Sequence, residues 1–137
     1  MTIKNKSRYP VVRGAYGAPG GDHQDCSVRA LMVAACVDYA VAYDACARAG
    51  RKQNQGMYPD HLDRAIREFV RAVYHTERRV TLARFVTDHP RGHYVIFVRG
   101  HFLALCDGIV FDWDKGISKA GRQRGAKRIV LFSWKLV

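Results

Sequence analysis

The chain has 137 residues, of which 48% are hydrophobic and 26% are charged, and its formal net charge is +11 at pH 7. A chain of this length is most simply one domain and can bury roughly two-thirds of its surface, so it needs neither disulfides nor a metal to fold. No apolar run approaches the length of about 18 residues that a membrane span requires, and the polar start is unlike a signal peptide. We therefore expect a single cytoplasmic domain, residues 1–137, that makes no membrane contact.

The excess of positive charge predicts attraction to polyanions. Basic residues are spread along the chain and are densest in residues 115–128, which contain no acid. Because no DNA- or RNA-binding motif accompanies the charge, we keep binding of nucleic acid or of an acidic protein as an alternative function.

The chain contains four cysteines, none of them in a CxxC pair: Cys26, Cys36, Cys46 and Cys106. The first three lie in or beside one helical pattern, where a rigid helix keeps them too far apart to form disulfides. Reduced thiols in a cytosol-like compartment are therefore expected.

Residues 1–25 form an irregular leader in this interpretation, because prolines and glycines interrupt them. Residues 26–49 then show apolar positions spaced near 3.6, which predicts one long amphipathic helix. Asp25 is its expected N-cap, and Gly50 is its expected stop.

A second helix is expected to begin at Pro59 and Asp60, with Asp60 as its cap. Its predicted buried stripe is Leu62, Ala65, Ile66, Phe69 and Val73. Residues 74–80 are expected to include a short strand, and Thr81 is expected to cap a short helix that runs through Val86.

The last third of the chain changes to the two-residue period of strands. Strands are predicted at residues 93–98, 101–106, 109–113 and 128–136, and Asp107-Gly108 is a strong signal for a tight hairpin turn. Helices followed by an antiparallel sheet indicate an α+β fold.

Cys26 is the first candidate for chemistry, because it lies in the first turn of the predicted helix. The dipole and the unpaired N–H groups of a helix N-terminus favour a thiolate, and a nearby imidazole would complete a thiolate–imidazolium pair. The charge of Asp25 opposes a second anion at this point. That objection weakens if Asp25 turns into its helix cap.

His101 begins the predicted strand of residues 101–106, which is the first strand of this hairpin. With a two-residue turn at 107–108, Asp114 lies directly opposite His101 and Asp112 is its diagonal neighbour, and all three share one face. Either acid is placed to accept the Nδ1–H of the imidazole. Cys106 is an odd number of positions from His101, which disfavours a zinc site built from both, and we expect no metal.

An acyl-transfer enzyme also needs donors for an oxyanion. The backbone N–H of Cys26 is one candidate, and Gln24 is the best side-chain candidate. His23 is a weaker alternative.

Two segments carry a family resemblance: residues 25–31, beginning Asp25-Cys26, and residues 100–112, beginning Gly100-His101. At these residues the chain resembles the papain-like cysteine peptidase superfamily. It looks closest to compact bacteriophage and bacterial papain-like domains and, more distantly, to the bacteriocin-processing peptidases. The resemblance implies that Cys26 is the nucleophile, His101 the base and Asp112 the orienting acid, and that no cofactor is used.

The sequence therefore predicts a papain-like α+β domain, with helices packed on a C-terminal antiparallel sheet, that acts as a cysteine hydrolase on peptides or proteins. If the chain is encoded by a phage, its expected location is the host cytoplasm. Two alternatives remain: a basic binding protein on the same fold without catalysis, and a thiol acyltransferase that uses an amine acceptor.

Overall fold

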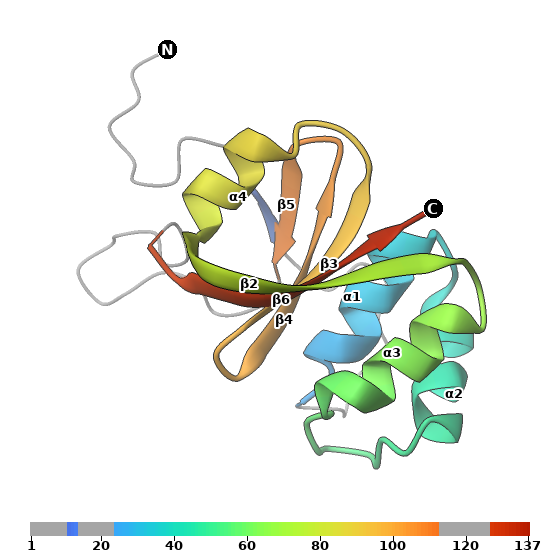
Figure 1. Ribbon diagram of the computed structural model, residues 1–137. Coiled ribbons are helices and arrows are strands. Elements are labelled where there is room, and N and C mark those ends of the chain that lie inside the picture. Colours follow the sequence, from blue (N-terminus) through green and yellow to red (C-terminus); the bar gives the residue numbers. More distant parts are fainter. Residues whose placement is uncertain (1–10, 14–23, 113–126) are drawn as a thin grey trace.

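The computed structural model describes residues 11–13, 24–112 and 127–137, and these form four helices and one sheet (Figure 1). The helices are α1 (Cys26–Ala35), α2 (Tyr39–Arg48), α3 (Pro59–Arg67) and α4 (Leu82–Asp88). The strands are β1 (Val11–Arg13), β2 (Ala72–Thr81), β3 (His93–Val98), β4 (His101–Cys106), β5 (Ile109–Asp112) and β6 (Ile129–Leu136). The predicted α+β class is confirmed.

The sheet has the strand order β1-β5-β4-β3-β6-β2. Its neighbouring strands are antiparallel, with the exception of β1, which pairs with β5 in parallel. The leader was expected to be irregular throughout, and that prediction is wrong at residues 11–13. A three-residue strand is too short to produce a recognisable alternation, so only its pairing with β5 reveals it.

Helices cover both faces of the sheet. In Figure 1, α1, α2 and α3 lie together on one side and α4 lies on the other. The side chains of β4 alternate between the two layers: Phe102 and Ala104 belong to the core beneath α1–α3, whereas Leu103 and Leu105 belong to the core beneath α4. The middle of β4 is therefore buried on both faces, and only its ends are open to solvent.

The predicted single helix over residues 26–49 is wrong, because the chain forms two helices that meet at a bend of 119°. Cys36 adopts the left-handed conformation, with φ 58°, and ends α1. Asp38 is then extended and precedes α2. The break spans three residues, which is nearly one helical turn. The apolar positions of α2 therefore continue the spacing of α1, and the sequence pattern does not reveal the break.

Helices α3 and α4 lie close to the positions that the sequence predicts. Helix α3 begins with Pro59 at its first turn, but Tyr58 occupies the N-cap position and Asp60 lies inside the helix, so the predicted cap is wrong by two residues. Its buried residues are Leu62, Ala65 and Ile66, as predicted, whereas Phe69 is only partly buried and Val73 lies on β2 with 46% exposure. Thr81 caps α4 by accepting a hydrogen bond from the Arg84 amide, as predicted.

The hairpin of β4 and β5 has the predicted register at its turn. Cys106 pairs with Ile109, and Leu105 pairs with Val110. Asp107 and Gly108 both have positive φ, at 49° and 84°, as a type I′ turn requires. Strand β5 is described only as far as Asp112, so Trp113 and the alternative acid Asp114 lie outside the described residues.

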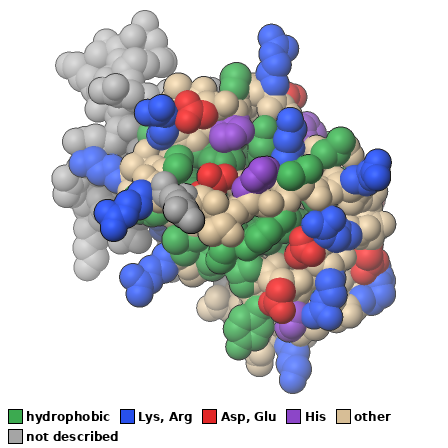
Figure 2. Space-filling view, viewed as in Figure 1, with side chains coloured by type: hydrophobic (Ala, Val, Ile, Leu, Met, Phe, Trp, Pro, Cys, Tyr) green, Lys and Arg blue, Asp and Glu red, His purple; other side chains and the backbone are tan. Residues whose placement is uncertain are grey.

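In the part of the chain that the structure describes, no single helix is long and apolar enough to cross a membrane. The bent pair of α1 and α2 meets that criterion by length and composition alone, and its buried residues belong to the core beneath the sheet. On the face shown in Figure 2, Lys and Arg side chains are scattered among acidic and apolar ones, without a single dense basic patch.

Candidate active site

Cys26 is the first residue of α1, and this helix packs against β4. The backbone N–H groups of a first helical turn have no partners inside the helix, and they make the local potential positive. The Cys26 side chain is partly buried rather than enclosed, so it combines a fixed position with access from solvent.

His101 and Asp112 form a hydrogen-bonded pair across the hairpin. Nε2 of His101 donates to Oδ1 of Asp112 over 2.8 Å, and the two side chains are only 12% and 6% exposed. The predicted neighbourhood of these residues is confirmed, but the expected ring nitrogen is wrong, because Asp112 was predicted to bind Nδ1. This leaves Nδ1 as the ring nitrogen that can exchange a proton with a nucleophile.

The Cys26 side chain lies close enough to the His101 ring to affect its pKa. Burial alone would lower the pKa of His101, but the hydrogen bonds to Asp112 and to Cys26, together with the negative charges of both groups, raise this pKa to about 9. At neutral pH the ring therefore carries a proton and a positive charge. An imidazolium beside a cysteine is the arrangement that cysteine nucleophiles use.

Asp25, the residue before Cys26, is buried and does not cap the helix with its side chain. Its Oδ2 instead accepts hydrogen bonds from Arg29 Nε at 3.0 Å and from the Tyr39 hydroxyl at 2.7 Å. The predicted cap is thus wrong in its bonding, although Asp25 does occupy the N-cap position. Because Arg29 compensates the carboxylate charge, Asp25 opposes a thiolate at Cys26 less than its sequence position implies.

Gln24 is exposed, and its backbone carbonyl accepts a hydrogen bond from Arg51 over 3.0 Å. Arg51 is 6% exposed, and its guanidinium lies over the Tyr43 ring, 5.4 Å from the centroid. The segment before the nucleophile is therefore tied to the residues that follow α2. The role of the Gln24 side chain as an oxyanion donor stays a prediction, and His23 lies outside the described residues.

The other three cysteines occupy different environments. Burial raises the pKa of Cys46 to about 12, and burial together with the charges of Cys36 and Asp107 raises the pKa of Cys106 to about 12. Cys36 is exposed at the end of α1. All four cysteines are unpaired in the structure. Cys36 is therefore the thiol against which the reactivity of Cys26 is best compared.

Sequence reasoning missed three residues that support the site: Arg29, Tyr39 and Arg51. The spacing of Asp25 and Arg29 is that of an ion pair on one helix face, so this contact was available from the sequence. Tyr39 and Arg51 reach the site only because the chain turns back after Cys36. The predicted continuous helix would keep both residues away from the site, so these contacts were not expected.

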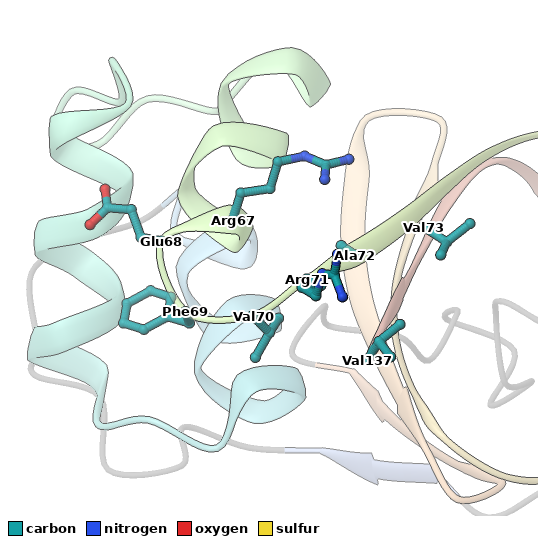
Figure 3. A pocket seen from close by; sticks show the side chains of 8 residues that line it. All are labelled: Arg67, Glu68, Phe69, Val70, Arg71, Ala72, Val73 and Val137. Carbon is teal, nitrogen blue, oxygen red and sulfur yellow. The ribbon is translucent and has the colours of Figure 1, made fainter.

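An open pocket of about 750 Å³ lies where α3 leads into β2 (Figure 3). Residues 67–73 and Val137 line it, and none of the candidate catalytic residues does. Two of its charged side chains already have partners, since Arg67 pairs with Asp63 and Glu68 pairs with Arg48. We therefore assign no chemistry to it.

Within the described ranges, no three His, Cys, Asp or Glu side chains are grouped closely enough to hold a metal ion. In comparisons with family models, curated proteins and solved structures, nothing matches this chain.

Proposed function

We propose that this protein is a papain-like cysteine hydrolase that acts on peptides or proteins, as a peptidase or isopeptidase. One observation carries the proposal: Cys26, at a helix N-terminus, lies beside an imidazole that is hydrogen-bonded to a buried carboxylate. The arrangement of a nucleophile helix packed on an antiparallel sheet, with the histidine and the acid on adjacent strands, supports the papain-like assignment.

The proposed reaction begins with attack of the Cys26 thiolate on the substrate carbonyl carbon. The carbonyl π electrons move to oxygen, and the oxyanion receives hydrogen bonds from the Cys26 amide and from the Gln24 side chain. His101 gives its proton to the leaving nitrogen, whose bond to carbon breaks, and a thioester remains. Water, deprotonated by His101, then attacks the thioester and releases the acid and the thiolate.

Asp112 keeps the ring of His101 oriented during this cycle, because the hydrogen bond occupies Nε2 and leaves Nδ1 as the nitrogen for proton exchange. Arg29 and Tyr39 have an indirect role, since they hold the Asp25 carboxylate beside the nucleophile. Every step uses side chains and water, so the proposed chemistry needs no cofactor.

Site-resolved alkylation tests the thiolate directly. With limiting iodoacetamide near pH 7 and peptide mass spectrometry, we expect Cys26 to react roughly ten-fold or more faster than Cys36, although Cys36 is the more exposed thiol. His101→Ala should remove this preference. His93→Ala is the matched control, because it deletes the imidazole beside Cys36, and it should leave the Cys26 rate unchanged.

Equal alkylation of Cys26 and Cys36 in the wild type would contradict the proposal. Hydrolysis is then measured with panels of fluorogenic peptide amides and isopeptides, and Cys26→Ser should abolish it. Transfer of the acyl group to an added amine, at the expense of hydrolysis, would instead favour an acyltransferase. Salt-sensitive binding of nucleic acid or of an acidic protein that survives Cys26→Ala, without any turnover, would favour the basic binding protein.

A further inference from the structure

Helix α1 and strand β4 bring a second pair of reactive groups together at the end of their contact that lies away from Cys26 and His101. Cys36 is the C-cap of α1, and Cys106 is the last residue of β4. Both sulfurs approach the same backbone oxygen, that of Val33, at 3.8 Å for Cys36 and 3.9 Å for Cys106. Two thiols that converge on one oxygen are neighbours in space.

The backbone around these thiols is held by contacts that do not involve sulfur. His93 pairs with Cys106 across β3 and β4, and its Nδ1 lies 2.9 Å from the carbonyl oxygen of Ala34 in the last turn of α1. The same ring nitrogen is 3.9 Å from Cys36 Sγ. The end of β4 and the end of α1 are therefore tied together independently of the redox state of the thiols.

The backbone of Cys36 is also unusual, because its φ of 58° belongs to the left-handed region that favours glycine. The cap hydrogen bonds from its N–H to Met32 and Val33 hold this conformation. Its side chain is exposed and can change rotamer, whereas Cys106 is partly buried. Burial is the largest cause of the raised pKa of Cys106, and the negative charge of Cys36 is the next. The effect of Cys36 also reflects the proximity of the two thiols.

We propose that Cys36 and Cys106 are a reversible disulfide site that joins the end of α1 to the end of β4. A small disulfide such as oxidised glutathione is the oxidant. The Cys36 thiolate attacks one of its sulfurs, the original S–S bond breaks, and one glutathione thiolate leaves. Cys106, on losing its proton, then attacks Cys36 Sγ and displaces the second glutathione. Two protein thiols lose two electrons, and one glutathione disulfide becomes two thiols.

The bond requires a change of the Cys36 rotamer to bring the sulfurs to about 2.05 Å, and the exposure of that side chain permits it. Cross-linking would fix the loop of residues 36–106, so the melting temperature should rise by about 5–10 °C. If the proposed function holds, the cross-link also fixes the interface whose other end aligns Cys26 with His101.

The test uses the full chain with Cys26→Ser, so that the proposed nucleophile neither competes for the oxidant nor decides the outcome. After equilibration in glutathione buffers, free thiols are alkylated, the protein is digested without reduction, and peptides are identified by mass spectrometry. We expect a peptide cross-linked between Cys36 and Cys106, which Cys36→Ser and Cys106→Ser each remove and the buried control Cys46→Ser leaves intact.

Glutathione attached to Cys36 while Cys106 remains open to alkylation would overturn the proposal, as would a major cross-link that contains Cys46. An unchanged melting temperature in cross-linked protein would show that the disulfide forms but does not stabilise the α1–β4 contact, which would overturn that part of the proposal. Since no step measures hydrolysis, failure here is distinct from failure of the proposed enzyme function.

Discussion

Replacement of Asp112 by Asn tests the electrostatic core of the site. The substitution keeps the size of the side chain but removes the negative charge 2.8 Å from Nε2 of His101. Among the effects that raise the pKa of His101, the hydrogen bond to Asp112 is the largest. We therefore expect Asp112→Asn to lower this pKa and to weaken the imidazolium.

The size of the effect follows from the pKa of about 9 in the wild type, against an ordinary value of 6.5. Loss of a hydrogen-bonded carboxylate beside a buried imidazolium is expected to lower the pKa by about 1–2 units, equivalent to about 1–3 kcal/mol. Near pH 8 at least about half of the rings are then neutral in Asp112→Asn, whereas the ring is mostly charged in the wild type.

Two measurements can detect the lowered pKa of His101 in Asp112→Asn. NMR titration of the His101 ring gives its pKa directly, and the rate of Cys26 alkylation against pH shows where the thiolate–imidazolium pair is lost. Asp107→Asn is the matched control, because Asp107 also lies beside a histidine, with its Oδ2 3.9 Å from His93 Nε2, but is exposed. A His101 titration that is the same in Asp112→Asn and in the wild type would refute the reasoning.

Three further predictions concern stability. Because the pKa of His101 is raised, the charged ring stabilises the folded state fully below about pH 6.5, and this stabilisation is lost as pH rises through about 9. Over that window, we expect the free energy of unfolding measured with urea to fall by at most about 3 kcal/mol. The substitution His101→Gln should remove this pH dependence. Thr81→Ala should lower the free energy of unfolding by about 1 kcal/mol, because it removes the N-cap of α4. The control Thr87→Ala, at an exposed site within α4, should lower it by less, and equal losses would argue against the cap. Trp134→Phe should cost about 2–4 kcal/mol, because it removes buried volume and the 3.1 Å hydrogen bond to Asp63, and a thermal melt unchanged from the wild type would contradict this.

The parts of the site that the sequence predicted depend on local rules. A two-residue turn at Asp107-Gly108 sets the register of β4 and β5, and the register alone brings His101 within reach of Asp112. Likewise, a helix that starts at Cys26 follows from the punctuation before it and the apolar spacing after it. Such signals lie within a few residues of the feature that they specify.

The parts that sequence reasoning missed depend on contacts between distant segments. The break at Cys36 conserves the apolar spacing, so it leaves no trace in a periodicity of 3.6. The partners of Asp25 and of the Gln24 carbonyl become neighbours only through that break. The choice of Nε2 rather than Nδ1 at His101 is set by side-chain rotation, which the strand register does not specify.

Two of the candidate catalytic residues, Cys26 and His101, begin elements whose interiors are buried. Cys26 begins α1, His101 begins β4, and Asp112 is the last described residue of β5. The interior of α1 and of β4 belongs to the core, so packing fixes where these end residues lie. The alignment of the site is therefore a property of the α1–β4 interface. Alkylation of Cys26 and cross-linking of Cys36 with Cys106 report on opposite ends of this interface, and a core substitution that tilts α1 should change both together.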